Sequence, residues 1–390
     1  MDNFPFALRT NWSQETNALN KAAEDLKKRG IDILDLTASN PTNCGFSYPE
    51  GLLAAFNSPA NLEYHPDACG MREARQAVAR YYALQKAMVP PEDIILTAST
   101  SEAYSFLMRL LVGPGERVLI PKPSYPLFQF LLEINDVHFD HYPLVFDGKK
   151  WNLDFQALER LAGPETRAII LVNPNNPTGS YISRAELDLL NKFCSEHKIA
   201  IISDEVFFGY PLSRTDAVSC AGNKTVLTFA LGGLSKTLGL PQMKCAWISA
   251  SGPRTIVQAA LSRLEIIADT YLSVNTPVQN ALGAWLEGAP AIQRQIIARV
   301  KENLKWLTMH LNDHTELLSL QGGWYATLRI PAVRTEEEWV LEFLREDHVS
   351  VYPGYFFDFD KEAYIILSLL PPNPVFQEAA GRIIRRLAKI

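Results

Sequence analysis

The segments RAIILVN (167–173) and AIISD (200–204) are short, largely apolar runs that are rich in isoleucine and other strand-forming residues. Four similar runs lie at 93–97, 117–121, 225–231 and 246–250. Such strands, separated by segments long enough for crossover helices, are typical of a parallel sheet that helices cover on both faces. We therefore predict an α/β lobe with a parallel or mostly parallel sheet in the middle of the chain.

Helical patterns support this lobe and predict a second one. Ser183 begins an amphipathic segment, and Glu186 follows three residues later, which is the capping-box pattern of a helix start. A long amphipathic helix is expected from about residue 290. A strand in GGWYATLRIP (322–331) and a terminal helix from Pro374 follow it. These last elements predict a smaller α+β lobe.

The size of the chain agrees with two domains. With 390 residues and 47% hydrophobic content, the chain can bury one large core and a second, smaller one. We expect residues 46–285 to form the large domain, and residues 1–45 together with 286–390 to form the small domain.

Composition also bears on partners and compartment. The net charge is −6 and the basic residues are scattered, which argues against a nucleic-acid surface or a polybasic membrane anchor. No apolar run is long enough to span a membrane, and no signal peptide is recognisable. The five cysteines are odd in number and have no paired short spacing, so neither a disulfide framework nor a zinc site is indicated. We expect a cytoplasmic protein without a metal site.

Three informative polar features come at or just after the ends of predicted strands. NPNNPTG (173–179) follows one strand, Asp204 ends the next, and Lys236 comes a few residues after the run at 225–231. Each alone could be a turn, a helix cap or an exposed amine. Because ligands collect at the carboxyl ends of parallel strands, their joint placement predicts a binding site at this edge of the sheet.

These stretches carry a family resemblance. NPNNPTG, SDEV (203–206) and LSKTLGLP (234–241) resemble the fold-type I pyridoxal-phosphate enzymes of the class I/II aminotransferase group, and residues 95–128 and 353–357 match further landmarks in order. The resemblance covers most of the chain. It implies a large cofactor-binding lobe with a smaller lobe, pyridoxal 5'-phosphate as cofactor, and transfer of an amino group from an amino acid or amine to a 2-oxo acid.

The resemblance assigns roles around the cofactor ring. It implies that Lys236 forms a Schiff base with the cofactor aldehyde and later moves a proton. Asp204 matches the aspartate that pairs with the pyridine nitrogen and so strengthens the ring as an electron sink. Asn176 matches the asparagine that donates to the phenolic oxygen, and Tyr125 matches the aromatic residue that stacks on the ring.

The phosphate group needs hydrogen-bond donors and positive charge. Ser99, Thr100 and Ser101 lie where a predicted strand passes into a helix, so backbone N–H groups and hydroxyls there can hold an anion, although helix capping alone would also explain them. Tyr64 matches a tyrosine that reaches the phosphate from the neighbouring subunit. The resemblance therefore implies a homodimer with shared active sites.

Several positions depart from the family pattern. Phe207 replaces the usual tyrosine that bonds the phenolic oxygen, and Gly233 replaces a serine. Lys244 replaces the usual phosphate-binding arginine; its ammonium still neutralises phosphate but lacks the bidentate fork of a guanidinium. Ser235 is a candidate substitute donor.

Ile366 stands where the family has the arginine that grips the substrate carboxylate. Isoleucine cannot pair with a carboxylate, so either another basic residue does so or the substrate carries a different group there. Arg9 and Arg329 are candidates, and each could equally be a solvated surface residue. An aromatic substrate pocket, or simply core packing, is expected from Tyr271, Trp324 and Tyr355.

Two other functions stay open. A β-eliminating carbon–sulfur lyase uses the same cofactor and the same α-proton abstraction. A non-catalytic sensor domain of this fold is the third reading, although no helix-turn-helix extension precedes residue 30.

Overall fold

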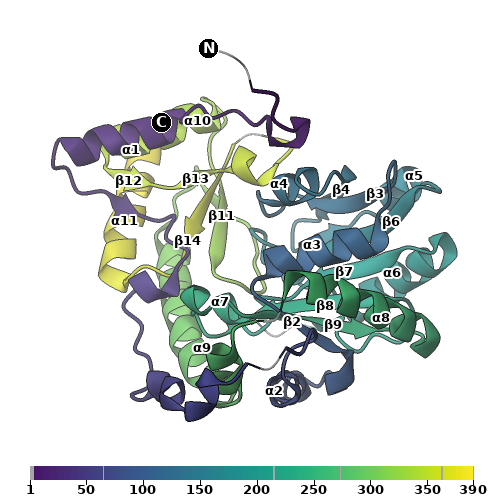
Figure 1. Ribbon diagram of the computed structural model, residues 1–390. Helices are drawn as coiled ribbons and strands as arrows, with labels where there is room; N and C mark the ends of the chain where they lie inside the picture. The colour runs from purple at the N-terminus through teal and green to yellow at the C-terminus, as the bar shows by residue number, and fades with distance from the viewer. Residues whose placement is uncertain (1–3, 65, 214–215, 273, 362, 390) are drawn as a thin grey trace.

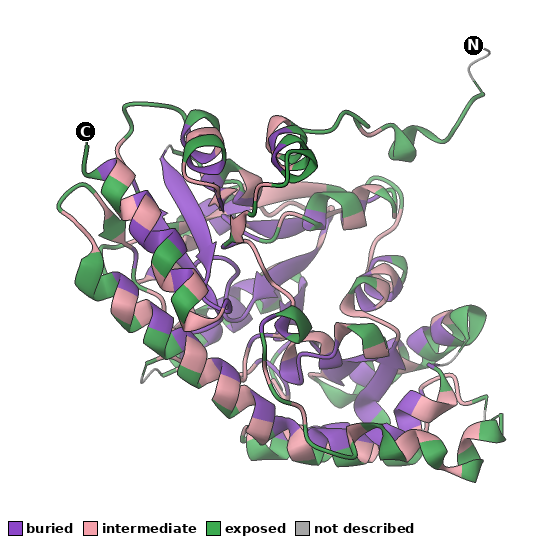
Figure 2. Cartoon of the chain, turned by 90° about the vertical axis from the view of Figure 1, so that its left-hand side faces the viewer, coloured by how far each residue is buried: buried purple, intermediate pink, exposed green. Residues whose placement is uncertain are grey.

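The computed structural model describes residues 4–64, 66–213, 216–272, 274–361 and 363–389. Figure 1 shows a large sheet flanked by helices on one side of the molecule and a smaller sheet with its own helices on the other. Buried residues concentrate in the strands of both sheets, whereas the covering helices expose their outer faces, as Figure 2 shows.

The large sheet has eight strands in the order β2-β9-β8-β7-β6-β3-β4-β5. The pairs within β8-β7-β6-β3-β4 are all parallel, and the pairs β2–β9, β9–β8 and β4–β5 are antiparallel. The predicted mostly parallel sheet is confirmed, and all six apolar runs form strands in it. The strands are β2 (Ile94–Thr97), β3 (Arg117–Lys122), β4 (His138–Phe146), β5 (Trp151–Leu153), β6 (Thr166–Val172), β7 (Ala200–Asp204), β8 (Thr228–Gly233) and β9 (Ala246–Ser251).

Helices cover both faces of this sheet because alternate residues of its central strands are apolar on both sides. Ile170 and Ile202 pack in one core with α3 and α8, and Ile169 and Ile201 pack in another with α5 and α6. The capping box predicted at Ser183 is present at the start of α6. The helices of this lobe are α2 (Arg72–Leu84), α3 (Thr100–Leu111), α4 (Phe128–Glu133), α5 (Phe155–Leu161), α6 (Arg184–His197) and α8 (Arg254–Tyr271).

The small lobe is α+β, as predicted. Its four-stranded antiparallel sheet has the order β10-β11-β14-β13, and β1 pairs with β12 in a separate parallel ribbon. The expected strand and terminal helix are β11 and α11. The strands are β1 (Leu34–Asp35), β10 (Glu316–Leu317), β11 (Tyr325–Arg329), β12 (Val349–Ser350), β13 (Tyr352–Pro353) and β14 (Tyr364–Ser368). The helices are α1 (Ala18–Lys28), α10 (Glu336–Glu346) and α11 (Asn373–Leu387).

One helix runs past both lobes. α9 spans Thr276–His310, so it begins well before the predicted start near residue 290 and continues through Pro290. Asn275 caps it by accepting a hydrogen bond from the backbone N–H of Val278 at 3.1 Å. α9 packs against α2 in the large lobe and α11 in the small lobe, and the expected domain boundary between residues 285 and 286 falls inside it. Of the helices in the described ranges, none is long and apolar enough to cross a membrane.

Candidate active site

The candidate site lies at the carboxyl ends of three neighbouring parallel strands. Asp204 is the last residue of β7, the NPNNPTG loop leaves β6, and Lys236 lies on α7 (Leu234–Thr237), which follows β8 directly. The backbone N–H of Asn173 donates to the carbonyl of Asp204 at 2.8 Å, which fixes the loop start against the end of β7. Because the strands are adjacent and parallel, their ends meet at one edge of the sheet.

Lys236 is enclosed by aromatic rings. Its Nζ lies 5.1 Å from the ring centroid of Trp324 and 5.5 Å from that of Phe207. Burial lowers the pKa of the Lys236 amine from 10.5 to about 8, and the negative charge of Asp204 opposes this shift. Tyr210 donates from its hydroxyl to the Lys236 carbonyl. The amine is therefore sheltered from solvent, and although it is still mostly protonated at pH 7, it loses its proton far more readily than an exposed lysine.

The carboxylate of Asp204 has one hydrogen-bond donor on each oxygen. The backbone N–H of Val206 donates to Oδ1 and the hydroxyl of Tyr104 donates to Oδ2, both at 3.2 Å. Burial raises the pKa of Asp204 to about 6, while these two donors and the charge of Lys236 lower it. At pH 7 the carboxylate is therefore mostly ionised in an environment where a cationic partner would be strongly favoured.

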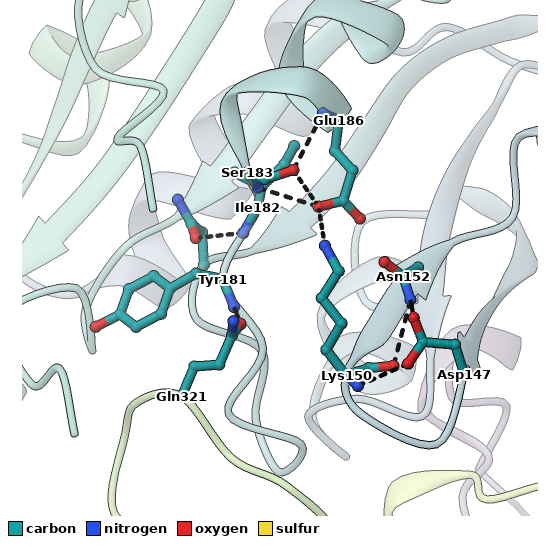
Figure 3. Close-up of polar contacts among 9 residues, drawn as sticks. Asp147, Lys150, Asn152, Tyr181, Ile182, Ser183, Glu186 and Gln321 are labelled. Carbon is teal, nitrogen blue, oxygen red and sulfur yellow. Dashed lines mark hydrogen bonds and ion pairs between the residues drawn. The ribbon is translucent and has the colours of Figure 1, made fainter. Parts of the chain in front are cut away.

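The NPNNPTG loop is held from both sides. Asn173 Oδ1 accepts from the backbone N–H of Ile182 at 3.2 Å. The backbone N–H of Tyr181 donates to the side chain of Gln321 at 2.9 Å, as Figure 3 shows. Gly179 adopts φ +70°, and a Cβ there would lie 2.6 Å from the carbonyl oxygen of Gly322. The loop is thus clamped to the turn that leads into β11, and only glycine fits at its end.

Asn176 lies inside this loop and is buried. Its side-chain Oδ1 has no hydrogen-bond partner among the described residues. A buried amide oxygen without a donor is costly, so Oδ1 is expected to accept from a group that the protein itself does not provide. The donor role that the resemblance gives to Asn176 belongs to Nδ2 of the same side chain.

Tyr125 lies between β3 and α4 and is 38% exposed. Its ring packs edge-on against Phe128 at 5.8 Å. Burial raises the pKa of Tyr125 to about 12, and the charge of Asp204 adds to the shift. The neighbouring Ser124 donates its backbone N–H to Phe357 O at 2.9 Å, which ties this segment to the small lobe.

The predicted anion-binding residues lie at the start of α3. Ser99 is the N-cap, and its Oγ accepts from the backbone N–H of Glu102 at 3.1 Å. The Glu102 carboxylate accepts from the N–H of Ala98 at 2.6 Å. Thr100 and Ser101 occupy the first two helical positions. Helix capping is therefore realised here, and the hydroxyl hydrogens of these residues can still be donated to an anion.

Three further predicted residues lie at the periphery. Ser235 is half-buried beside Lys236, whereas Lys244 is exposed and has φ +49°. Tyr64 is 72% exposed. Within the described ranges, Lys244 and Tyr64 have no hydrogen bond or ion pair, so this single chain does not bring Tyr64 to its own site through any such contact.

Ile366 lies in the middle of β14, where it is fully buried and pairs with Thr327 of β11 and Tyr352 of β13. Each of the two candidate arginines makes an ion pair at the surface. Arg329 pairs with Glu316 at 2.6 Å, and Arg9 pairs with Asp136 at 2.5 Å. Both arginines are therefore engaged in exposed ion pairs.

The three aromatic residues for which a substrate pocket was expected, Tyr271, Trp324 and Tyr355, lie in different environments. Trp324 is fully buried and contacts Lys236. Tyr271 packs instead against Phe106 of α3, with ring centroids 5.1 Å apart. Tyr355 is 44% exposed and packs against Phe356. Of the three, only Trp324 is in contact with the candidate site.

Two acidic or phenolic groups at the site were not anticipated. Tyr104 contacts Asp204, and Glu205 is buried directly after it, with hydrogen bonds from Ser203 Oγ at 3.0 Å and the Cys220 N–H at 2.6 Å. Burial raises the pKa of Glu205 to about 7. The sequence SDEV placed Glu205 beside the key aspartate, whereas no pattern connected Tyr104 with it.

The residues present fit the cofactor that the resemblance implies. A buried carboxylate suits a protonated ring nitrogen, an amine of lowered pKa suits an aldehyde, and the partnerless oxygens of Asn176 and Ser124 leave buried polar groups to be satisfied. In the described ranges, no group of three or more histidine, cysteine or acidic side chains is arranged to hold a metal ion.

The chain is similar to known proteins over most of its length. The family model "Aminotransferase class I and II" matches residues 31–378. A glutamate-pyruvate aminotransferase, AlaA, of Escherichia coli K12 is 27% identical over 362 residues, which cover 90% of this chain and 89% of that protein. An alanine aminotransferase of Mycobacterium tuberculosis H37Rv is 25% identical over an alignment that covers 90% of this chain and 84% of that protein.

Solved structures show the same fold. An alanine aminotransferase from Pyrococcus furiosus superposes with a TM-score of 0.89 at 24% identity, covering 99% of this chain and 100% of that one. An Escherichia coli aminotransferase superposes with a TM-score of 0.88 at 25% identity, covering 99% and 98%.

Proposed function

The chain belongs to the family of class I and II aminotransferases and is itself an aminotransferase, and we propose that Lys236 and Asp204 carry its reaction with pyridoxal 5'-phosphate. The observation that carries this proposal is the placement of a buried amine of lowered pKa and a buried carboxylate on neighbouring strand ends. The family uses this cofactor, and the buried polar groups of the site fit it.

The chemistry divides between cofactor and chain. When bound, pyridoxal phosphate supplies an aldehyde carbon and a ring that withdraws electrons from the α-carbon of the substrate. Asp204 would pair its negative charge with the ring nitrogen and so favour the protonated state of that nitrogen. Lys236 would anchor the cofactor, and its Nζ, once released and neutral, would move the proton from the α-carbon of the substrate to the aldehyde-derived carbon of the cofactor. Trp324 and Phe207 exclude water from the amine while it does so.

Other residues hold the cofactor in this proposal. Asn176 donates to the phenolic oxygen and Tyr125 stacks on the ring. The phosphate is held by the start of α3 and by the remaining donors, which are Ser99, Thr100, Ser101, Ser235, Lys244 and Tyr64. The exposure of Lys244 and Tyr64 supports a role for them at a surface that a second copy of the chain covers.

We also propose a cytoplasmic homodimer in which Tyr64 of one copy reaches the phosphate of the other. Exposed apolar residues in the segment that precedes Tyr64, among them Leu53 and Leu62, support such a contact, and a groove of about 840 Å³ is lined in part by Leu53. All five cysteines are free thiols, which suits a reducing compartment. The division into a large domain, 46–285, and a small domain of the remaining residues stays part of this proposal.

The substrates are proposed as an amino acid or amine donor and a 2-oxo acid acceptor. Relatives named glutamate-pyruvate and alanine aminotransferases make alanine, glutamate and pyruvate the first compounds to test. The comparisons do not favour the carbon–sulfur lyase or the sensor reading.

A single-turnover assay tests this function. The purified protein is loaded with the cofactor and mixed with each of a panel of amino acids and amines, without any 2-oxo acid. Amino transfer converts the bound cofactor to its pyridoxamine form and yields one oxo product per site. Release of ammonia and pyruvate with the cofactor unchanged would instead assign a lyase, and no conversion by any donor would contradict catalysis.

A further inference from the structure

The two oxygens of the Asp204 carboxylate are bonded by very different donors. Oδ1 accepts from the backbone N–H of Val206, which belongs to the same turn and cannot be varied independently. Oδ2 accepts from the hydroxyl of Tyr104 at 3.2 Å, and the two residues are 100 positions apart in the chain. The second bond is therefore a tertiary contact between distant parts of the chain.

Tyr104 is held so that its hydroxyl stays at this carboxylate. Its side chain is 2% exposed, and its ring packs edge-on against Phe128 with centroids 5.4 Å apart. It belongs to an apolar core together with Leu107 of the same helix. A phenol hydroxyl buried in such a core is costly unless it is bonded, so its bond to Asp204 is favoured over rotation away.

The helix that carries Tyr104 also carries the proposed anion-binding residues. α3 begins after Ser99, and Tyr104 lies one turn beyond Thr100. α3 therefore carries residues for two parts of the site. In the proposed function its first residues would hold the cofactor phosphate, and Tyr104 in its second turn contacts the Asp204 carboxylate. A helix of twelve residues fixes the distance between these two points.

We propose that Tyr104 is a positioning residue that orients the Asp204 carboxylate and keeps it ionised for its pairing with the cofactor ring nitrogen. This inference rests on the proposed function, since it names a residue that acts through Asp204. Tyr104 touches neither Lys236 nor the substrate in this role. Tyr104 instead lowers the proton affinity of the Asp204 carboxylate.

The electrostatics of the site agree with this role. The hydrogen bond from Tyr104 lowers the pKa of Asp204, in opposition to burial. Burial raises the pKa of Tyr104 well above its ordinary value, so the phenol remains a donor throughout the working range. The other titratable groups that interact with Asp204 are Lys236 of α7, Tyr125 before α4 and Tyr82 of α2. Of these, only Lys236 is charged near neutral pH.

The test is Tyr104→Phe, which removes a single oxygen, with Tyr142→Phe as the matched control. Tyr142 is also fully buried in the large lobe, but its hydroxyl donates to the carbonyl of Ile170 at 2.8 Å, away from Asp204. In the cofactor-free protein, the carboxyl carbon of Asp204 is followed by carbon-13 NMR as a function of pH and is assigned by its loss in Asp204→Asn. Cofactor affinity is measured separately by quenching of protein fluorescence.

Loss of a hydrogen bond to a charged group predicts that Asp204 in Tyr104→Phe binds its proton about tenfold more tightly. From a pKa of about 6, the ionised fraction of Asp204 at pH 7 then falls from about nine in ten to about one in two, so the cofactor dissociation constant is predicted to rise about twofold at pH 7 and close to tenfold at about pH 5. Tyr142→Phe should change neither quantity, even if its thermal midpoint falls similarly. The proposal is overturned if Tyr104→Phe lowers the thermal midpoint but leaves the Asp204 titration where it is. Failure of amino transfer in the unmodified protein is a separate result, because the titration needs no cofactor or substrate.

Discussion

Replacement of Asp204 by asparagine gives the sharpest prediction about the Lys236 amine. Burial lowers the pKa of Lys236 from 10.5 to about 8, and the charge of Asp204 is the force that keeps it from falling further. At pH 7, an amine of pKa about 8 is neutral in about one molecule in ten, which is about 300-fold more often than an amine of pKa 10.5. Since only the neutral amine attacks an aldehyde, this factor enters the rate of cofactor capture directly.

In Asp204→Asn the opposite charge is removed while the burial stays. The pKa of Lys236 is therefore predicted to fall below its value in the unmodified protein, so the neutral fraction at pH 7 rises. The amide oxygen of the substituted side chain would still accept the hydrogen bond from Tyr104, so the fold should be kept. Asp25→Asn is the control, because Asp25 is an exposed residue of α1.

Competitive labelling measures this titration. The cofactor-free protein is treated with a trace of acetic anhydride from pH 6 to pH 11, and labelling of Lys236 is quantified by peptide mass spectrometry relative to the exposed Lys192. Half-maximal labelling is expected near pH 8 in the unmodified protein and in Asp25→Asn, and at lower pH in Asp204→Asn. A midpoint near 10.5, or one that rises in Asp204→Asn, would refute the reasoning.

Three further predictions concern stability. Burial raises the pKa of Glu205 from 4.5 to about 7, so its contribution to the free energy of unfolding is full below pH 4.5, and about 3 kcal/mol is lost as the pH rises through 7. Glu205→Gln stays neutral, so in urea unfolding the variant should gain that amount relative to the unmodified protein as the pH is raised from 4.5 to 8. Parallel pH profiles of the two proteins would contradict this. Ile366→Arg buries an unpaired charge in β14 and should cost about 3 kcal/mol or more, against about 0.5–1.5 kcal/mol for Ile366→Val; equal unfolding midpoints would show that the arginine finds a partner. Gly232→Ala places a Cβ 2.5 Å from Trp247 Nε1 and should lower the stability by about 1–3 kcal/mol in thermal unfolding. In Gly288→Ala, on α9, the added Cβ has nothing within 4 Å, so this variant should be neutral or stabilised by up to about 1 kcal/mol. The opposite order of stabilities would disprove the packing argument.

The sequence predicted the central strands because each of them is buried on both faces and so reads as an apolar run. It did not predict β4, whose residues are mostly half-buried at the side of the sheet, or β5, which has three residues. The expected start of α9 near residue 290 was too late, because the helix begins at Thr276. The helix continues through Pro290 because its packing on α2 and α11 compensates the lost hydrogen bond.

The sequence predicted those site residues that come directly after neighbouring parallel strands. Asp204, Lys236 and the loop after β6 meet because adjacent parallel strands end together. The contact of Trp324 with Lys236 and that of Tyr104 with Asp204 depend on how the small lobe and α3 pack, and no local pattern encodes them. The exposure of Lys244 and the engagement of Arg9 with Asp136 are likewise tertiary facts.

The most direct measurement concerns the covalent link at Lys236. The protein is loaded with pyridoxal phosphate, reduced with sodium borohydride, digested and analysed by mass spectrometry. We predict one cofactor mass per chain on the peptide that contains Lys236, and none in a folded Lys236→Ala variant. Attachment at another lysine, or equal attachment to Lys236→Ala, would contradict the account.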